Sequence, residues 1–300
     1  MLIFIAGGTG FVGSHLVPEL SKRGIKTRCL LRSAERAPRC VGAETVRGTL
    51  DKIPRGALDS VDMVVHLVGI LAEAGPDTFE SVVSGTANLV EEALVSGVKR
   101  FFYQSSLGAS LRSRNRYQKT KAQAEEIVKD SGMGYTIFRP SLILGRDDGF
   151  TKQMVSLINS SPVVPVPGMG AAKFQPLAIS DWVKCFLSML ENGRFMDGTY
   201  EFGGPEQFSF NDLLTLYMKT MGVEKKLVHV PAGIVKTGIG LLQFARAAGL
   251  RKLPPVGEEQ LALLETDNIT DPDSIKKQFG FEPVNIRQAL KEYLRAQEAK

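Results

Sequence analysis

Residues 6–13 read Ala6-Gly7-Gly8-Thr9-Gly10-Phe11-Val12-Gly13 and continue directly from the apolar run Leu2–Ala6. Glycines at this spacing, Gly7, Gly10 and Gly13, predict a tight turn between a strand and a helix, a backbone that a bound group can approach, and close packing of the helix on the strand. The free amide groups and the positive end of the helix dipole favour an anion there. This stretch therefore predicts a binding site for the pyrophosphate of a dinucleotide.

The first half of the chain alternates strand-like and helix-like segments, which is typical of a parallel sheet with crossover helices. Apolar, β-branched runs predict strands at Leu2–Ala6, Thr27–Leu31, Glu44–Arg47, Met63–Val68, Arg100–Gln104 and Tyr135–Phe138. Helical periodicity predicts the intervening helices at Phe11–Arg23, Phe79–Gly97 and Tyr117–Ser131. Because parallel strands are buried on both faces, nearly continuous apolar runs support this assignment.

The second half of the chain, after Arg139-Pro140, has a different composition and residue pattern. The Pro- and Gly-rich segment Ser160–Lys173 predicts a loop, and Ser180-Asp181-Trp182 predicts the start of a helix. An apolar stretch with a helical period follows at Pro231–Leu250, and an amphipathic helix is predicted near Asn285–Arg295. These segments predict a smaller cap added to the first half.

We therefore predict an α/β fold, a Rossmann-type doubly wound parallel sheet with a smaller, discontinuous C-terminal cap domain. The dinucleotide-binding domain is expected to cover residues 1–140, with return segments near 174–202. The substrate or cap region is expected to cover residues 141–173 and 203–300.

Composition and charge exclude several classes of protein. With 300 residues, 43% of them hydrophobic and 23% charged, the chain can bury a full core and differs from disordered and fibrous proteins. The net charge of +5 is mild. The densest basic cluster, Arg112, Arg114 and Arg116, is interpreted as a solvated loop rather than a site for an anion. We expect no nucleic-acid partner.

Cysteine and histidine usage points away from disulfide and metal chemistry. The three cysteines, Cys29, Cys40 and Cys185, have no metal-ligand spacing, and the histidines lie far apart. The first apolar run is too short for a signal peptide or a membrane helix. We expect a cytoplasmic protein with no metal site and no transmembrane segment. Contact of residues 231–250 with a membrane surface is the less favoured alternative to a packed cap helix.

The residue that follows the second predicted strand bears on the choice of dinucleotide. NAD-binding proteins usually place an acid on the ribose 2′-hydroxyl about twenty residues beyond the glycine motif. This chain has Leu31-Arg32-Ser33 there, and a guanidinium suits a 2′-phosphate. Arg32 therefore favours NADP, with NAD as the second choice, unless its side chain only lies along the sheet edge. Asp51 either faces the adenine or is a solvated loop carboxylate.

Tyr117 and Lys121 lie four residues apart, on one face of the third predicted helix. An ammonium beside a phenol lowers the pKa of the phenol from about 10, which makes the tyrosine a usable acid at neutral pH. The spacing alone is common, since an exposed helix with a lysine along its surface has the same pattern.

Taken in order, the motifs resemble the short-chain dehydrogenase/reductase superfamily in its extended or atypical branch. The matching pieces are residues 7–13, Val64–Gly69, Gly85–Glu91, Ser105-Ser106, Tyr117 with Lys121, and Arg139-Pro140 with Gly145. The resemblance implies that Ser106, with Ser105 as the substitute, orients the reacting oxygen and that Tyr117 transfers the proton. It implies that Lys121 holds the nicotinamide ribose and tunes the tyrosine. The residues expected to bind the cofactor are Gly7, Thr9, Gly10, Phe11, Val12, Gly13, Arg32, Leu50, Leu67, Val68, Gly69, Lys121 and Pro140.

Several positions depart from the sugar-nucleotide epimerases of that superfamily. Eleven positions separate Ser106 from Tyr117, which is shorter than in the epimerases, and Val82 replaces a family asparagine. Leu142 and Arg146 stand where the epimerases carry an asparagine and a proline. Because a leucine cannot donate a hydrogen bond to a sugar-nucleotide diphosphate, a UDP-sugar substrate is disfavoured.

The second half resembles a narrower group, related to the NADPH-binding accessory subunit of respiratory complex I. The residues that carry this resemblance are Pro254-Pro255, Glu259-Gln260-Leu261 and Leu264–Asn268. It implies a firmly held NADP(H) and an association with membrane or quinone biology.

The leading functional interpretation is an NADP(H)-dependent oxidoreductase that transfers hydride to or from a small, fairly apolar carbonyl or quinone-like substrate. The substrate would bind where the carboxyl ends of the strands meet the cap. One alternative is a non-catalytic NADPH-binding sensor or assembly protein, which the complex I resemblance favours and the retention of Tyr117 and Lys121 opposes. Another alternative is a nucleotide-sugar epimerase or dehydratase that uses the same site.

Overall fold

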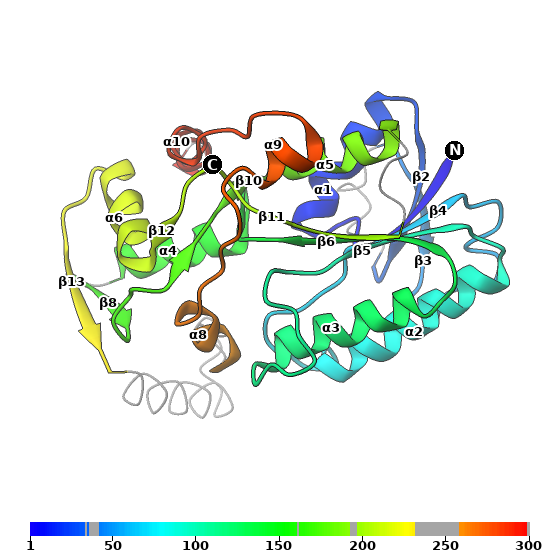
Figure 1. Ribbon diagram of the computed structural model, residues 1–300, viewed down its shortest axis with the longest axis horizontal. Coiled ribbons are helices and arrows are strands. Elements are labelled where there is room, and N and C mark those ends of the chain that lie inside the picture. Colours follow the sequence, from blue (N-terminus) through cyan, green and yellow to red (C-terminus); the bar gives the residue numbers. More distant parts are fainter. Residues whose placement is uncertain (34, 36–41, 161, 193–196, 232–257, 299–300) are drawn as a thin grey trace.

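A seven-stranded parallel sheet forms the centre of the molecule (Figure 1). The computed structural model describes residues 1–33, 35, 42–160, 162–192, 197–231 and 258–298. The strands, in their order across the sheet, are β11 (Gly198–Phe202), β6 (Gly134–Pro140), β5 (Arg100–Gln104), β4 (Met63–His66), β1 (Leu2–Ala6), β2 (Lys26–Leu31) and β3 (Glu44–Arg47). The order reverses beside β1, so the crevice outside the carboxyl ends of β1 and β4 is the place where such sheets bind ligands.

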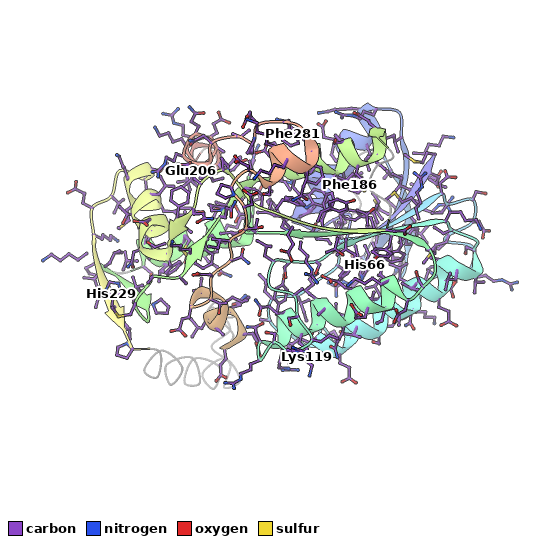
Figure 2. All side chains as sticks on the ribbon, viewed as in Figure 1. His66, Lys119, Phe186, Glu206, His229 and Phe281 are labelled. Carbon is purple, nitrogen blue, oxygen red and sulfur yellow. The ribbon has the colours of Figure 1, made fainter. Side chains whose placement is uncertain are left out.

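Helices cover both faces of this sheet. The helices α1 (Phe11–Lys22) and α5 (Ile179–Asn192) lie on one face, and α2 (Phe79–Val95) and α3 (Arg116–Lys129) lie on the other (Figure 1). Each face has its own apolar core, and Figure 2 shows Phe186 and the buried ring of His66 on opposite sides of the sheet. The predicted doubly wound parallel sheet is confirmed.

A smaller cap lies beside the carboxyl ends of the strands, at the left of Figure 1. Its helices are α4 (Gly149–Asn159), α6 (Phe210–Thr220), α8 (Glu258–Leu264) and α10 (Ile286–Glu298), and α9 (Ser274–Phe279) packs on α5. Its strand pairs are β7 (Ile143–Leu144) with β10 (Leu177–Ala178), β9 (Lys173–Phe174) with β12 (Phe208–Ser209), and β8 (Val163–Pro167) with β13 (Lys226–Val230). The cap has a third apolar core, and the chain leaves it for α5 and β11 before returning to it, which makes it discontinuous.

Some predicted boundaries differ from the structure. The fourth strand ends at His66 rather than Val68, although the Leu67 amide still donates to the Ala6 carbonyl at 2.8 Å. The loop predicted at 160–173 was wrong in part, because β8 lies within it and pairs in parallel with β13. The prolines of β8 are tolerated because a strand in a two-stranded sheet needs backbone donors on one side only. The predicted helix at 231–250 lies outside the described residues, apart from Pro231.

Candidate functional site

The glycine turn joins β1 to α1 and has the shape that its sequence predicts. Gly7 has a φ of +93°, which favours glycine, and the Gly10 amide donates to the Gly7 carbonyl at 3.0 Å. A methyl group at Gly13 would collide with the Gly7 carbonyl oxygen and lie 2.6 Å from Gly8 Cα. Gly10 is the N-cap of α1 and makes no side-chain capping bond. The start of α1 therefore presents backbone amides that can donate hydrogen bonds to an anion.

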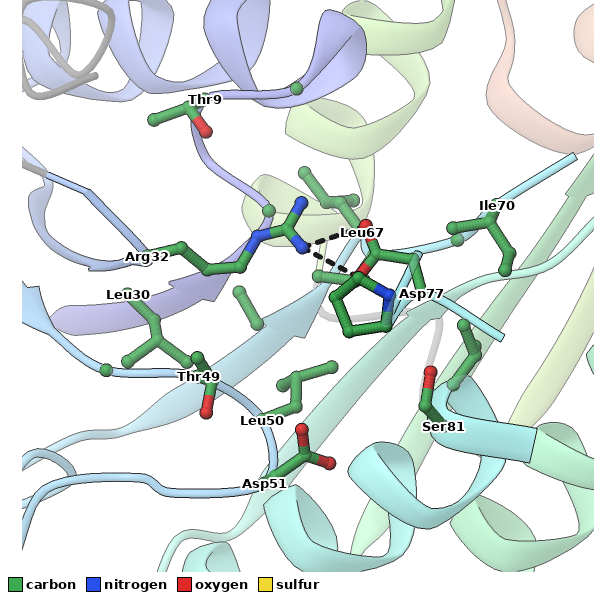
Figure 3. Close-up of a pocket in the computed structure, with 18 residues that line it drawn as sticks. Thr9, Leu30, Arg32, Thr49, Leu50, Asp51, Leu67, Ile70, Asp77 and Ser81 are labelled. Carbon is green, nitrogen blue, oxygen red and sulfur yellow. Dashed lines mark hydrogen bonds and ion pairs between the residues drawn. The ribbon is translucent and has the colours of Figure 1, made fainter. Parts of the chain in front are cut away.

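A cavity of about 340 Å³ lies against this turn (Figure 3). The predicted cofactor residues that line it are Gly7, Thr9, Gly10, Arg32, Leu50, Leu67, Val68 and Gly69. The predicted cofactor residues outside its lining are Phe11, Val12, Gly13, Lys121 and Pro140. Ligand cavities in proteins span about 300–1,000 Å³, so this one suits one end of a dinucleotide rather than the whole molecule.

The sequence reasoning missed one wall of the cavity. Ile70, Pro76, Asp77, Ser81 and Val82 line it from the loop after β4 and from the first turn of α2. This wall carries no recognisable motif. The available signal was topological, because the connection that follows the strand beside β1 is expected to border the crevice of a doubly wound sheet.

The Arg32 guanidinium is held by a carboxylate of that missed wall. Its Nη1 donates to both carboxylate oxygens of Asp77, at 2.7 and 2.9 Å. The two side chains are about half exposed, with 56% of Arg32 and 40% of Asp77 accessible. Arg32 therefore reaches over the cavity rather than lying along the sheet edge, as Figure 3 shows.

Tyr117 lies in the first turn of α3, next to the loop that follows β5. Asn115 caps this helix by accepting a hydrogen bond from the Gln118 amide at 3.2 Å. Burial raises the pKa of Tyr117, and the facing Ser106 hydroxyl opposes this rise. The two hydroxyls do not reach good hydrogen-bond geometry, and Ser106 Oγ is buried without a partner among the described residues. Ser106 and Tyr117 thus face each other, with unused hydrogen-bonding capacity at the serine.

Lys121 is deeply buried one turn further along α3. Its Nζ donates to the Gln104 carbonyl at 2.7 Å and lies 5.0 Å from the centre of the Tyr103 ring. Burial lowers the pKa of Lys121 to about 8. The pKa of Tyr117 was expected to be lowered, and this expectation was wrong, because burial raises that pKa.

Gly69 connects the cavity with Lys121. It lines the cavity, and a methyl group at this position would lie 2.7 Å from Lys121 Nζ. A larger residue at position 69 would therefore separate the lysine from the cavity. Lys121 of α3 therefore lies against the cavity wall at Gly69.

A buried ion pair attaches the C-terminal half of α3 to β6. Arg139 of β6 donates to the two Glu125 carboxylate oxygens at 2.6 and 2.8 Å, and Glu125 is fully buried. Ser105 also donates to Glu125. Ser105 is thereby engaged away from Tyr117, so Ser106 is the serine that faces the tyrosine.

The remaining candidates for chemistry are packed residues. His66 is fully buried, its Nε2 pairs with Thr86 Oγ1 at 3.0 Å, and burial lowers its pKa to about 3. Cys29 and Cys185 are buried thiols, and Cys40 lies outside the described residues. Within the described ranges, no group of histidine, cysteine or acidic side chains has the geometry of a metal site.

Residues 7–160, slightly more than half of the chain, match a protein family described as NAD(P)H-binding. The chain belongs to this family. The match covers the glycine turn, the cavity walls, Ser106 and the Tyr117 helix. A nucleotide-binding fold is therefore established from sequence and structure together.

Three curated proteins show the range of the relatives. The mitochondrial NADH dehydrogenase (ubiquinone) 1 alpha subcomplex subunit 9 of Arabidopsis thaliana is 28% identical over 90% of this chain and 70% of its own. A ceramide reductase of Caulobacter vibrioides is 31% identical over 55% of this chain and 53% of its own. A 4-hydroxy-2-methyl-3-oxo-4-farnesyl-3,4-dihydroquinoline-1-oxide ketoreductase of Stigmatella aurantiaca is 26% identical over 94% and 92%. The predicted resemblance to complex I subunits is confirmed.

Solved structures agree with the fold. UDP-glucose 4-epimerase of Thermotoga maritima, solved with UDP-glucose, superposes with a TM-score of 0.72 at 20% identity and covers 99% of both chains. This likeness supports the Rossmann-type architecture. In the described part of the chain, every helix is too short or too polar to span a membrane.

Proposed function

We propose that the protein is an NADP(H)-dependent oxidoreductase that reduces or forms a carbonyl group on a small, fairly apolar or quinone-like substrate. The observation that supports it most directly is that Tyr117 faces Ser106, while Lys121 of the same helix lies beside Gly69, which lines the cavity. A binding module needs the cavity but has no need of a serine and a tyrosine hydroxyl facing each other.

The raised pKa of Tyr117 suits the reductive direction. The phenol stays protonated at neutral pH, so it can donate its proton to a carbonyl oxygen as that oxygen becomes negative. Ser106 Oγ, which has a free donor, would orient the same oxygen. The bound cofactor would supply the hydride.

Lys121 would gain a second partner when the cofactor binds. Its ammonium donates to the Gln104 carbonyl and lies beside Gly69. An ammonium has three donors, so the nicotinamide ribose can accept a second bond without loss of the first. This geometry favours a lysine that holds the ribose and, once charged and close, stabilises the phenolate of Tyr117.

The preference for NADP(H) over NAD(H) rests on Arg32. It is the one basic side chain among the described residues that line the cavity, and a guanidinium binds a phosphate through paired hydrogen bonds. NAD(H) is the second choice. The glycine turn at the start of α1 would hold the pyrophosphate of either cofactor.

The proposed apolar substrate is supported by Leu142 in the cap and by the names of two relatives. Leu142, at the position of the epimerase asparagine, packs on the apolar core of the cap and cannot bond a diphosphate. The ceramide reductase and the farnesyl quinoline oxide ketoreductase are named for substrates with apolar skeletons. A nonpolar carbonyl compound fits these observations better than a sugar nucleotide.

Tyr117→Phe tests the proposal. We expect NADPH binding to stay within about twofold, because the phenol oxygen adds little to cofactor affinity, while carbonyl reduction falls by about 100-fold or more. Tyr135→Phe is the matched control, since Tyr135 lies at the amino end of β6, away from the cavity. Binding is measured by calorimetry, and turnover by NADPH absorbance on a panel of long-chain ketones and quinones.

A second candidate is a protein that binds NADPH without turning it over and assembles with other subunits. The similarity to the Arabidopsis mitochondrial subunit over 90% of the chain favours it. The two candidates differ in the Tyr117→Phe experiment. A protein of the second kind binds NADPH but oxidises none with any substrate of the panel, with or without the tyrosine hydroxyl.

A further inference from the structure

Arg32 and Asp77 stand on opposite walls of the cavity. Arg32 follows β2, Asp77 lies just before α2, and the ion pair between them spans the space in Figure 3. Both line the cavity. The guanidinium proposed to receive a 2′-phosphate therefore already has an anionic partner inside the same site.

We propose that Asp77 is a specificity-determining residue, which competes with the 2′-phosphate of the cofactor for Arg32 and so weakens the preference for NADP(H) over NAD(H). This inference rests on the proposed function. A phosphate monoester carries more than one negative charge at neutral pH, and its approach to Arg32 brings it near the Asp77 carboxylate. A ribose without the phosphate meets no such repulsion and leaves the ion pair closed across the cavity.

Backbone hydrogen bonds hold the loop that carries Asp77 at the cavity wall independently of Arg32. Asp77 and Ala74 exchange two backbone hydrogen bonds, at 3.0 and 3.1 Å. Thr78 caps α2, and the neighbouring Glu73 carboxylate binds the Phe79 amide at 3.0 Å. These bonds do not involve the Asp77 side chain. The competing charge therefore persists with the cofactor bound, and Asp77→Asn should leave the loop in place.

The loop that carries Asp77 is also held by an ion pair between Glu73 and Arg116. Both Glu73 oxygens accept from Arg116 at 2.9 Å, and Arg116 precedes Tyr117. This pair fastens the cavity wall to the start of α3 independently of Arg32. Loss of the Asp77 charge thus changes the electrostatics at Arg32 while the wall keeps its attachment.

The charges that line the cavity favour competition between Asp77 and a 2′-phosphate for Arg32. Among the described residues that line it, Arg32, Asp51 and Asp77 are the charged ones, so the acidic side chains outnumber the basic one. Asp51 makes no ion pair with the described residues, whereas Asp77 lies within 2.9 Å of the guanidinium. Asp77 is therefore the carboxylate that a 2′-phosphate must displace.

Calorimetric titration of the full-length protein with NADPH and with NADH tests the inference. The variants are Asp77→Asn, Asp77→Ser, Arg32→Gln and the Arg32→Gln/Asp77→Asn double variant. The matched control is Glu80→Gln, which removes the same charge from the first turn of α2 outside the cavity. We expect both Asp77 variants to raise the ratio of NADPH to NADH affinity by about threefold to fivefold, the upper range for a half-exposed ion pair. We expect no change for Glu80→Gln, and none for Asp77→Asn in the Arg32→Gln background.

An unchanged or lower ratio in both Asp77 variants overturns the inference, and a lower ratio would mean that Asp77 orients Arg32 for the phosphate. An equal rise in Glu80→Gln, or a rise that persists without Arg32, also overturns it, because the effect would then be a general one of charge. If the wild-type protein binds neither dinucleotide, the proposed function fails instead. Thermal denaturation of each variant confirms that the fold is retained.

Discussion

Replacing Lys121 with methionine tests whether this buried positive charge serves the reaction rather than the stability of the fold. Burial lowers the pKa of Lys121 to about 8, against an ordinary value of 10.5, and the nearby Glu125 carboxylate opposes this shift. The net shift corresponds to about 3 kcal/mol by which the folded protein disfavours the charged form. The favourable contacts of the ammonium, its bond to the Gln104 carbonyl and its approach to the Tyr103 ring, are already part of this balance. Methionine keeps an apolar side chain at this position and removes the disfavoured charge.

We therefore expect Lys121→Met to leave the protein at least as stable as the wild type at pH 7, with a gain in the free energy of unfolding of up to about 3 kcal/mol. Carbonyl reduction should nevertheless fall by at least about tenfold, because the ribose and the phenolate lose their cation. The control is Lys119→Met, two residues earlier on the same helix, where the side chain is exposed (Figure 2). Urea denaturation measures the stability, and NADPH absorbance measures the turnover.

The pH dependence of the same comparison makes the test sharper. Because the pKa of Lys121 is lowered in the folded state, the folded protein releases this proton at a lower pH than the unfolded chain does. The unfolded state then binds more protons between about pH 8 and 10.5, so wild-type stability rises with pH relative to Lys121→Met across that window. Parallel stability curves for the two proteins, or a loss of more than about 1 kcal/mol in the variant at pH 7, would refute this reasoning.

Two further predictions concern the catalytic pH range and the glycine turn. The kcat/KM for carbonyl reduction should fall above about pH 8, because Lys121 loses its charge in the free enzyme there. A profile that stays flat to about pH 9.5 would mean that Lys121 is not the titrating group. Gly13→Ala should weaken NADPH binding by at least about tenfold in calorimetry, because the new methyl group meets Gly7 and Gly8 and opens the turn. Gly149→Ala, where a methyl group would meet open space, should bind NADPH normally, and equal loss in both variants would contradict the role of the turn.

The glycine turn and the sheet were predictable because their signals are local. The spacing of Gly7, Gly10 and Gly13 requires a particular backbone, and an alternation of apolar strands with amphipathic helices leaves few topologies. The four-residue spacing of Tyr117 and Lys121 likewise needs only a helix. For these features, short-range chemistry and the three-dimensional arrangement agree.

The environment of the site was harder to predict because it depends on packing between distant segments. Asp77 reaches Arg32 across 45 positions of sequence, and no motif marks the loop that carries it. The pKa of Tyr117 was predicted to be lowered, whereas burial raises it, and the depth of burial depends on segments far apart in the sequence. The pairing of β8 with β13 was missed for a similar reason, since prolines suggest a loop until the partner strand is known.

The most direct test of the whole account is calorimetric titration of the wild-type protein with NADPH. We predict that one NADPH binds per chain, more tightly than NADH, and that Arg32→Gln removes most of this difference while both dinucleotides still bind. Failure of both dinucleotides to bind at millimolar concentration would contradict the assignment of the glycine turn and the cavity as a cofactor site.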